Sequence, residues 1–500
     1  MAAEKLKPEV SLTTLFAGLV DVESNLLVSG IAIDSRLVKP GDLFMAYRGS
    51  SSNGIDYIDA AIAAGAIAVA AEAAEQFDEA TISVPFIKVT NLRKQVGVIA
   101  SRFFNEPSAA LNVIGVTGTN GKTTVSFLVS HALGQCQQET AFIGTLGYGK
   151  TGDIRDGNMT TPDPIKLHSL FAEWRNELQN VVMEVSSHAL DQGRVSGVQF
   201  DIGVFTNLSR DHLDYHETLE EYAAAKASLF STESLQHAVI NHDDSFGREL
   251  INRLQTELDL IVYTTDRSTI EDIDNHQVVA SETSTDSDLV TTIMISSPWG
   301  EAQVKTGLLG RFNVSNILAA FSVLCLRGIP VAQAANAISS FHGVPGRMEC
   351  FQTSDKALLV VDYAHTPDAL EKALQSLRPY CQGKLYCVFG CGGDRDTGKR
   401  PQMGAVAETN ADVVVITNDN PRTEQPERIV SQILAGMQDK ERVAVRYDRS
   451  DAIINTCLQA KAGDIVLIAG KGHETTQTIG TDVMPFSDRE LARRLGEESS

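Results

Sequence analysis

Apolar runs alternate with helix-like segments along most of this chain of 500 residues. Short apolar runs that read as strands recur, with helical periodicity between them, at residues 111–116, 141–144, 181–185, 200–205 and 238–240. This alternation predicts a mostly parallel, doubly wound sheet. A polar stretch at 269–288 interrupts the pattern, and a two-strand excursion is expected within 289–306.

A second α/β unit follows Val344-Pro345-Gly346, which we interpret as a hinge. Its predicted strands lie at residues 358–361, 384–389, 413–417, 443–447 and 465–469. Five such strands fit a Rossmann-like sheet, but no G-x-G-x-x-G run opens it, so a bound dinucleotide is not implied. Near the N-terminus, short strand signals accompany an alanine-rich helix at 57–64 and a strand at 66–71.

The length of the chain suggests about three domains at roughly 150 residues each. We predict an α/β protein with a small N-terminal domain at 1–91, a central doubly wound, P-loop-like domain at 92–343 and a Rossmann-like C-terminal domain at 344–500.

Charge and composition narrow the function classes. The formal net charge of −22 argues against nucleic acid or an anionic membrane surface as a partner, although local basic groups can still bind a phosphorylated substrate. No apolar run reaches the ~18 residues of a membrane span, and no apolar signal core follows the first residues. Cys381, Cys387 and Cys391 cluster without a C-x-x-C motif and are expected to be reduced. A cytoplasmic location is therefore expected.

The stretch Gly115-Val-Thr-Gly-Thr-Asn-Gly-Lys-Thr-Thr124 joins a predicted strand to a predicted helix at 122–133. Glycine-rich turns of this kind let backbone amides surround phosphate oxygens at a helix N-terminus. Lys122 would reach the β/γ-phosphates and Thr123 would offer a hydroxyl to Mg²⁺. Val116 stands where the usual motif has glycine, so a plain glycine-rich turn is the alternative to an ATP or GTP site.

Ligands for a cation are predicted at two further strand ends. Glu184 lies among apolar residues at the end of the strand 181–185, where a second Mg²⁺ ligand belongs, although a solvated carboxylate would look the same. Two His and two Asp follow the strand 200–205 within residues 211–216. Lys226, on an alanine-rich helix, would by itself be interpreted as a surface lysine.

These motifs together resemble the Mur ligase family, which shares its ATPase core with folylpolyglutamate synthetase. The matching runs are GTNGKTT at 118–124, EVSSH at 184–188, TNLSRDHLD at 206–214, the helix of Lys226, GRFNVSN at 310–316, PGRME at 345–349 and DYAHTP at 362–367. The resemblance covers all three predicted domains. It implies an N-terminal UDP-binding domain, a central ATPase and a C-terminal domain for the incoming amino acid.

For ATP and two Mg²⁺ ions, the resemblance implies contacts from Gly118, Thr119, Asn120, Gly121, Lys122, Thr123, Thr124, Asn316, Arg347 and Asp362. Thr123 and Glu184 would hold the first Mg²⁺, and Glu184, His212 and Lys226 the second. Lys226 would carry a CO₂-derived carbamate, which turns a repelling ammonium into an anionic oxygen donor. Lys122, Glu184, His212 and Lys226 are the implied catalytic residues.

For the UDP-linked substrate, the resemblance implies Ile33, Ser35, Ser50, Ser51, Ser52, Thr160, Thr161, Ser186, Gln192 and Arg194. The run Asp34-Ser35-Arg36 is similar to the uridine-contacting loop of the family. Ser50-Ser51-Ser52 replaces a His-Gln-Ala stretch that is common in the branch, so only backbone contacts carry over there.

Three strand ends in the C-terminal unit predict the site for the amino acid: Arg395, Asp419, Asn420, Pro421, Arg422, Gly470 and Glu474. A rim with arginines and carboxylates suits a ligand with several carboxylates and ammoniums, whereas plain charged turns are the alternative. The run Asp-Asn-Pro-Arg resembles the signature of the branch that adds meso-diaminopimelate. Members that add L-lysine differ at the arginine.

The implied reaction is two-step acyl activation in cytoplasmic peptidoglycan precursor synthesis. ATP would phosphorylate the terminal carboxylate of UDP-N-acetylmuramoyl-L-alanyl-D-glutamate, and the amine of meso-diaminopimelate would then attack the acyl phosphate. We expect a monomer that binds neither nucleic acid nor membrane. The alternatives are a ligase of the same branch that adds L-lysine, a folylpolyglutamate-type ligase, and a regulatory nucleotide switch. The switch is disfavoured because no N-K-x-D motif occurs.

Overall fold

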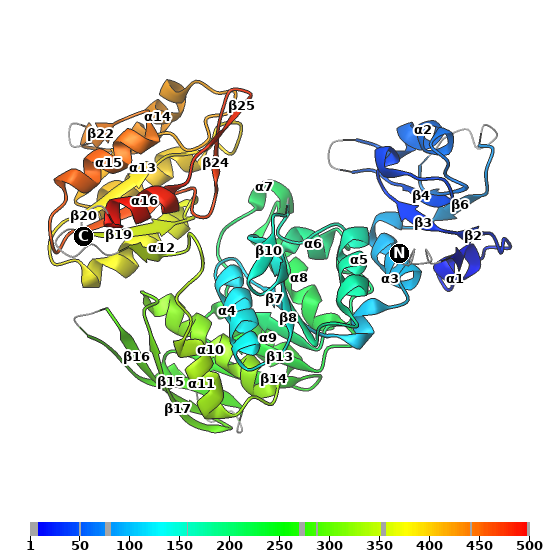
Figure 1. The fold of residues 1–500 in the computed structure, drawn as a ribbon, viewed down its shortest axis with the longest axis horizontal. Coiled ribbons are helices and arrows are strands. Elements are labelled where there is room, and N and C mark those ends of the chain that lie inside the picture. Colours follow the sequence, from blue (N-terminus) through cyan, green and yellow to red (C-terminus); the bar gives the residue numbers. More distant parts are fainter. Residues whose placement is uncertain are drawn as a thin grey trace, which may run out of the picture. The chain divides into compact units, whose positions relative to one another are not determined.

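The structure is a computed structural model, and it describes residues 9–49, 52–75, 82–157, 159–269, 276–286, 289–351, 357–440 and 443–497. It divides into two compact units, which are described separately below (Figure 1). The first contains Met1–Leu208 and His212–Val262, and the second contains Ser209–Asp211 and Tyr263–Ser500. The predicted domain boundaries near residues 91 and 343 stay predictions.

The first unit begins with a small parallel α/β sheet. Its strands lie side by side in chain order: β3 (Gly30–Ala32), β4 (Asp42–Ala46), β5 (Ala68–Glu72) and β6 (Phe86–Val89). Side chains alternate between the faces, so that Leu43 and Met45 pack with helix α3 (Leu92–Phe103) and Phe44 packs with α2 (Ile58–Ala63). The helix predicted at 57–64 is α2, which covers residues 58–63, and Tyr57 belongs to the preceding 3₁₀ turn, η2 (Gly54–Tyr57).

This sheet is accompanied by short elements at the start of the chain. β1 (Val10–Ser11) pairs antiparallel with β2 (Leu27–Val28). The helix α1 (Leu12–Phe16) follows β1 directly, and Leu12, Leu15 and Phe16 are buried in the same core as α3.

The central sheet of the first unit is parallel and doubly wound, as predicted. Its parallel strands lie in the order β8 (Thr140–Gly144), β11 (Asn180–Glu184), β7 (Asn112–Thr117), β12 (Ile202–Phe205) and β13 (His237–Asn241). An antiparallel hairpin of β9 (Gly147–Lys150) and β10 (Asp153–Arg155) extends it beyond β8, and β14 (Asp259–Thr264) follows β13. The connecting helices are α4 (Lys122–Gln135), α5 (Pro164–Trp174), α6 (Ser187–Asp191), α7 (Leu213–His216), α8 (Leu219–Ala227) and α9 (Ser245–Leu254).

The second unit begins with an antiparallel meander of β15 (Gln277–Thr285), β16 (Thr291–Ser297) and β17 (Gly300–Thr306). The interruption predicted at 269–288 is therefore wrong for residues 277–285. Most of β15 is polar and exposed, so cross-strand pairing with β16 rather than burial holds it. Helices α10 (Arg311–Leu326) and α11 (Val331–Ser339) follow.

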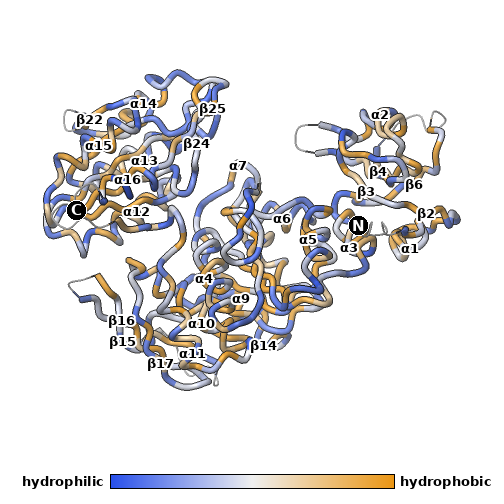
Figure 2. The backbone as a smooth tube through the Cα atoms, in the orientation of Figure 1, coloured by the Kyte–Doolittle hydropathy of each residue, from blue (hydrophilic) through white to orange (hydrophobic). Residues whose placement is uncertain are grey.

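The C-terminal sheet has the five predicted parallel strands. They lie in the order β19 (Leu358–Asp362), β23 (Ile465–Ala469), β20 (Leu385–Phe389), β21 (Val413–Ile416) and β22 (Val443–Val445), with β18 (Glu349–Phe351) antiparallel beside β19. One apolar core includes α12 (Pro367–Leu377), α13 (Lys399–Asn410) and α14 (Pro426–Leu434), and a second includes α15 (Arg449–Gln459) and α16 (Asp488–Glu497). Figure 2 shows the mixed hydropathy expected of helices with one face on a sheet.

A hairpin of β24 (Thr476–Ile479) and β25 (Asp482–Pro485) was not predicted. Its residues are largely exposed, and the strands pair with each other, which leaves little apolar pattern in the sequence. In the part of the chain that the structure describes, no helix is long and apolar enough to cross a membrane.

Candidate active site

The glycine-rich run at 118–124 forms the turn between β7 and α4, as predicted. Gly118 and Gly121 adopt φ values of +147° and +85°, which side chains other than glycine rarely tolerate. A Cβ at Gly118 would also collide with the Thr206 hydroxyl. The amides at the start of α4, a helix of 14 residues, are thereby presented as an anion site, with Thr123 buried and Lys122 and Thr124 half-buried beside them.

Thr206 and Asn207, at the end of β12, brace this turn. The Asn207 carbonyl accepts from the Thr119 amide at 2.7 Å, and the Asn207 side chain accepts from the Asn120 amide at 3.0 Å. The Asn120 carbonyl in turn accepts from the Thr206 hydroxyl at 2.6 Å and from the Asn207 side chain at 3.0 Å. No such role was predicted for these two residues, which fix the conformation of the loop.

Two lysines converge on the carbonyls of the same turn. The Lys122 Nζ donates to the Gly118 and Thr119 carbonyls at 3.0 and 2.9 Å, and the Lys226 Nζ donates to the Gly118 carbonyl at 2.7 Å. Lys226 is 1% exposed and its Nζ lies 4.2 Å from the centroid of the Tyr222 ring. The interpretation of Lys226 as a surface lysine, which its helix alone would favour, is therefore wrong.

Glu184 is fully buried at the end of β11, next to the phosphate loop. Its carboxylate accepts from the Thr123 hydroxyl at 3.0 Å and from the amide and hydroxyl of Thr145 at 2.8 and 3.2 Å. No basic side chain pairs with it among the residues described. A buried carboxylate beside a hydroxyl and without a counter-ion is a hard-oxygen donor set that fits Mg²⁺.

His212 lies near the second lysine. It precedes α7 with φ +54°, and its ring lies 4.9 Å from that of His188 and 6.1 Å from that of Tyr222, the ring that Lys226 faces. Burial lowers the pKa of the neighbouring His216, whose ring nitrogen is 2.9 Å from the Ser187 hydroxyl. Among the described residues, no three His, Cys, Asp or Glu side chains group closely enough to hold a metal. The metal set of Thr123, Glu184, His212 and Lys226 stays a prediction.

The predicted substrate residues after the phosphate loop form one hydrogen-bonded chain with Glu184. The Thr161 hydroxyl donates to the Glu184 carbonyl at 2.8 Å and accepts from the Ser186 amide at 3.1 Å. The Arg194 guanidinium donates to the Thr161 carbonyl at 3.0 Å and to Gln192 Oε1 at 2.7 Å.

Two more contacts extend this chain. The Thr160 hydroxyl lies 3.2 Å from that of Thr145, and Gln192 Nε2 donates to the Tyr215 hydroxyl at 3.1 Å. Burial lowers the pKa of Arg194, and the nearby Arg93 lowers it further. A partly buried arginine beside a second arginine favours an anionic group of a ligand.

In the N-terminal domain, the predicted contacts lie at the carboxyl edge of the parallel sheet. Ile33 and Ser35 follow β3, and the turn with Ser52 follows β4, where the Ser52 carbonyl accepts from the Gly49 amide at 2.9 Å. Asp34 caps the turn of Ser35 through the Arg36 amide at 3.0 Å. The Arg36 guanidinium, which also bonds Asp34, lowers the pKa of that carboxyl. Ser50 and Ser51 lie outside the described residues.

In the second unit, Arg347 and Asp362 lie together. The Arg347 guanidinium stacks over the Tyr363 ring, 4.4 Å from its centroid. The Asp362 carboxylate accepts from the Met348 and Ala364 amides at 2.7 and 2.8 Å, which ties two loops together. Burial raises the pKa of Asp362, against the lowering effect of Arg347.

Two further residues of the second unit, Asn316 and Gly346, are held in place by local contacts. Asn316 is buried and donates to the Asn313 side chain at 3.0 Å within α10. The loop of Gly346 packs closely on the loop after β23, since a Cβ at Gly346 would overlap the His473 amide and one at Gly472 would lie 2.7 Å from the Gly346 carbonyl.

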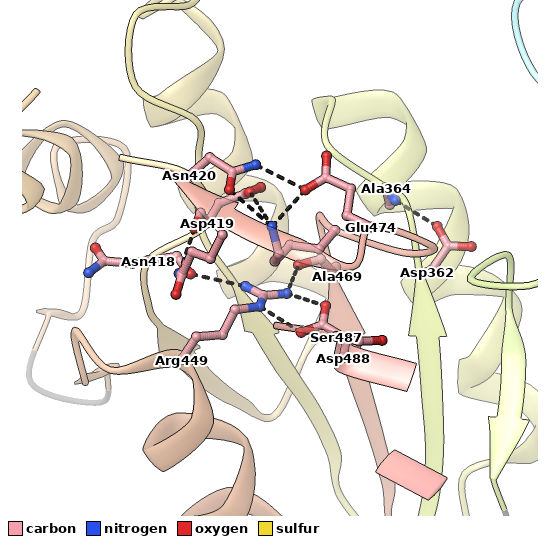
Figure 3. A network of polar contacts seen from close by, with 12 residues as sticks. Asp362, Ala364, Asn418, Asp419, Asn420, Arg449, Ala469, Glu474, Ser487 and Asp488 are labelled. Carbon is pink, nitrogen blue, oxygen red and sulfur yellow. Dashed lines mark hydrogen bonds and ion pairs between the residues drawn. The ribbon is translucent and has the colours of Figure 1, made fainter. Parts of the chain in front are cut away.

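The amino-acid residues predicted after β21 and β23 meet at one edge of the C-terminal sheet. Asn420 Nδ2 donates to Glu474 Oε2 at 2.9 Å, and Figure 3 shows these two side chains pointing toward one another. Asp419 is buried beside them, and burial raises its pKa. Gly470, with φ +117°, has no room for a Cβ, which would lie 2.9 Å from Asp419 Oδ2.

The loop after β20 lies beside this rim. The Arg422 Nη1 donates to the Gly393 carbonyl at 2.7 Å, and a Cβ at Gly392 would lie 3.1 Å from Arg422 Nη1 and 3.7 Å from Arg395 Cγ. Arg395 is exposed, and a Cβ at Gly393 would overlap the Pro421 carbonyl. The two predicted arginines, Arg395 and Arg422, therefore both lie close to Gly392 in the loop after β20.

Sequence reasoning missed the buried charges beneath the rim. Lys471 is fully buried and contacts Asn420 and Glu474, while Arg449 and Asp488 are fully buried as an ion pair. Their local patterns resemble an ordinary loop and two helix starts. Lys471 stands in the run GKGHE at 470–474, in the loop predicted for the amino acid, but no role was assigned to it from the sequence.

Comparison with known proteins identifies related domains along most of the chain. The chain matches the models of the Mur ligase family catalytic domain over residues 27–104, the Mur ligase middle domain over 116–324 and the Mur ligase glutamate ligase domain over 346–472. The UDP-N-acetylmuramoyl-L-alanyl-D-glutamate--2,6-diaminopimelate ligase of Coxiella burnetii is 48% identical, over 94% of this chain and 96% of that protein. The ligase of the same name from Pseudomonas aeruginosa is 46% identical over 97% and 98%.

Solved structures of related ligases have a similar fold. A structure of a ligase of that name has a TM-score of 0.70 and 35% identity, and covers 98% of this chain and 99% of its own. A folylpolyglutamate synthase from Mycobacterium tuberculosis shares the fold at a TM-score of 0.60 and 17% identity, covering 76% and 92% of the two chains. The family predicted from the ordered motifs is thereby confirmed: the chain belongs to the Mur ligase family.

Proposed function

We propose that this protein is an ATP-dependent ligase that adds meso-diaminopimelate to UDP-N-acetylmuramoyl-L-alanyl-D-glutamate in peptidoglycan precursor synthesis. The observation that carries the proposal is the rim formed by the hydrogen-bonded Asn420 and Glu474, with Arg422 on the same loop as Asn420, because its charges suit an amino acid with two zwitterionic centres. The names of the relatives, which are 46–48% identical over nearly the whole chain, support the same substrates.

The first step transfers the γ-phosphoryl group of ATP to the terminal carboxylate of the dipeptide, and ADP leaves. The amides at the start of α4 and the ammonium of Lys122 bind the phosphates and neutralise charge that develops during transfer. Thr123 and Glu184 would hold a Mg²⁺, and bound Mg²⁺ supplies further charge neutralisation at the phosphates. Asn316, Arg347 and Asp362 are proposed to contact the nucleotide.

The carboxylate must be held still for this transfer. We assign that task to the hydrogen-bonded chain of Thr160, Thr161, Ser186, Gln192 and Arg194, which lies directly beside Glu184. Ile33, Ser35 and the turn with Ser52 would bind the uridine end at the carboxyl edge of the N-terminal sheet. Both sets lie within the first unit.

In the second step an amine of meso-diaminopimelate attacks the acyl carbon, the C–N bond forms, and phosphate leaves. The amine loses one proton overall. Arg422 and Arg395 are proposed to bind the carboxylate of the distal centre, and Asp419 and Glu474 its ammonium. L-lysine lacks that carboxylate and would leave an arginine without its partner.

Lys226 is proposed to lose one proton to give the neutral amine, which reacts with CO₂, forming an N–C bond and releasing a second proton. Its burial beside Gly118 and Tyr222, near His212, supports a role other than that of a surface lysine. The resulting carbamate oxygens would serve as ligands of a second Mg²⁺, together with Glu184 and His212.

The test is phosphate release measured with ATP, Mg²⁺, the UDP-linked dipeptide and a panel of amino acids. We expect release only when the dipeptide and meso-diaminopimelate are both present. Equal release with L-lysine would favour the alternative branch, and release with a folate and glutamate would favour the folylpolyglutamate type. ATP binding without any amino-acid-dependent release would favour the nucleotide switch. We also propose that the protein is cytoplasmic and monomeric. Size-exclusion chromatography with light scattering tests the oligomeric state.

A further inference from the structure

We infer that Lys471 is a positioning residue that holds Glu474 and Asn420 in the geometry needed to bind the amino acid. This inference rests on the proposed function. Lys471 follows β23 by two residues and is fully buried, which sets it apart from a lysine that reaches a substrate.

The contacts of Lys471 join two loops of the rim. Its Nζ donates to Glu474 Oε2 at 2.6 Å and to Asn420 Oδ1 at 3.0 Å. Because Asn420 Nδ2 also donates to Glu474 Oε2, at 2.9 Å, the three side chains close a triangle of hydrogen bonds. The triangle fixes the loop after β21 against the loop after β23.

The triangle leaves one side of Glu474 available. The bonds from Asn420 and Lys471 both go to Oε2, whereas Oε1 has no hydrogen-bond partner among the described residues, and the side chain is 31% exposed. One carboxylate oxygen is thus anchored below and the other is presented at the surface. An anchored carboxylate binds an ammonium with less loss of side-chain entropy than a free one.

Asn420 is restrained in the same way. Its Oδ1 accepts a hydrogen bond from Lys471 and another from the Thr478 amide at 3.0 Å. One of its two side-chain N–H groups donates to Glu474. Its second N–H group is the one available to a ligand. Lys471 therefore sets the direction in which both residues can act.

The charges of the rim lead to the same assignment. Lys471 faces two carboxylates, Glu474 and, at 3.9 Å, Asp419. These three groups carry a net charge of about −1, which suits one ammonium of the ligand. Without Lys471, Glu474 and Asp419 would lose the cation that lies within 4 Å of both, and their mutual repulsion would turn Glu474 away toward solvent.

The experiment compares Lys471→Met with Lys461→Met, since Lys461 is an exposed lysine of the same domain. In the phosphate-release assay we expect Lys471→Met to raise the KM for meso-diaminopimelate by about 10–100-fold, as for the loss of a hydrogen bond to a charged group. The KM values for ATP and the UDP-linked dipeptide should change by less than about 2-fold, as should all constants of Lys461→Met. A general structural defect would raise all three KM values or lower kcat alone.

A double-mutant cycle with Glu474→Gln tests whether Lys471 acts through Glu474. The KM of the double variant for meso-diaminopimelate should lie within about 2-fold of that of the poorer single variant, because both changes break the same contact. If Lys471→Met does not give a cooperative thermal transition, Lys471→Gln, which keeps a donor, takes its place in the cycle.

The outcomes separate the two proposals. An active wild type with an unchanged KM for meso-diaminopimelate in folded Lys471→Met overturns the positioning role and leaves the proposed function in place. Multiplicative effects in the cycle overturn it too. A wild type without release that depends on meso-diaminopimelate overturns the proposed function, and the positioning role with it.

Discussion

Arg449 and Asp488 form an ion pair in which both side chains are fully buried, with nitrogen–oxygen distances of 2.7 and 2.8 Å (Figure 3). The same guanidinium donates to the Ala469 carbonyl, at the end of β23, and to the Asn418 carbonyl, beyond the end of β21. Burial opposes the charge of Arg449, but the opposing Asp488 raises its pKa overall. This pair therefore joins the ends of β21 and β23, from which the two loops proposed to bind the amino acid emerge.

Replacing Arg449 by Met should lower the free energy of unfolding by about 3–5 kcal/mol, because it leaves the Asp488 carboxylate buried without a partner. Chemical denaturation followed by circular dichroism measures the change. Arg446→Met is the matched control, since Arg446 pairs with Asp451 at the surface and should contribute about 0–1 kcal/mol. Equal effects of the two variants would contradict the importance given to the buried pair.

Lys122→Ala should lower kcat by about 10²–10³-fold or more, because it removes a charge that neutralises the transferring phosphoryl group. Thermal stability should change little, since the Lys122 side chain is half-buried and donates to carbonyls of its own loop, Gly118 and Thr119. Lys150→Ala removes an exposed lysine paired with Glu177 and serves as the control. Near-normal phosphate release from folded Lys122→Ala would refute the assignment of the loop.

Lys226 should carry a modification with the mass of CO₂, about 44 Da, that is lost in acid. Mass spectrometry of the intact protein at neutral pH, before and after acidification, tests for it. Lys226→Ala should be inactive, and a small carboxylic acid at high concentration should restore part of the activity. Full activity of Lys226→Ala without any additive contradicts the proposed role.

Arg422→Ala should reduce kcat/KM for meso-diaminopimelate strongly and that for L-lysine only slightly. The wild type should prefer meso-diaminopimelate by about 10²–10⁴-fold, because lysine leaves a partly buried guanidinium without its carboxylate. The ratio of the two kcat/KM values is the measurement, and Arg428→Ala, on α14 after the same loop, is the control. A wild type that uses both amino acids equally, or a variant that loses both equally, would show that Arg422 does not determine specificity.

His168 should make stability depend on pH between about 4 and 6.5. Burial lowers its pKa to about 4, and its Nε2 faces the Ser196 carbonyl at 3.1 Å, so the folded protein holds it neutral. The unfolded chain takes up the proton first as the pH falls, so this contribution is complete above the unfolded value of 6.5 and is lost on going down to 4. The loss should reach roughly 3 kcal/mol.

Unfolding of His168→Leu at pH 4.5 and 7.5 measures this contribution. The variant should show a smaller difference between the two pH values than the wild type. His276→Leu, which removes an exposed histidine, should keep the difference of the wild type. An unchanged pH dependence in His168→Leu would show that His168 is not its source.

The strand–helix alternation predicted the central sheet and the C-terminal sheet because parallel strands that are buried on both faces carry long apolar runs. The same principle placed Asn420 and Glu474 together, since the carboxyl ends of parallel strands meet at one edge. The elements that escaped prediction, β15 and the hairpin of β24 and β25, depend on pairing between strands rather than on burial.

The burial of Lys226 and Lys471 could not be predicted for a different reason. A lysine is buried only where partners satisfy its ammonium, and for each of these two lysines at least one partner is distant in sequence. Gly118 lies 108 residues from Lys226, and Asn420 lies 51 residues from Lys471. The family resemblance supplied a role for Lys226, but neither resemblance nor periodicity supplied one for Lys471.

The close packing of Gly346 on Gly472 and His473 has a consequence for the proposed nucleotide and amino-acid sites. Arg347 follows Gly346, and Glu474 follows His473. A residue proposed to contact the nucleotide and a residue proposed to bind the amino acid therefore lie next to backbone segments that are in direct contact. No flexible side chain lies between those glycines to absorb a displacement. A shift of either loop would therefore displace the other, so we expect the proposed nucleotide contact at Arg347 and the proposed amino-acid contact at Glu474 to move together.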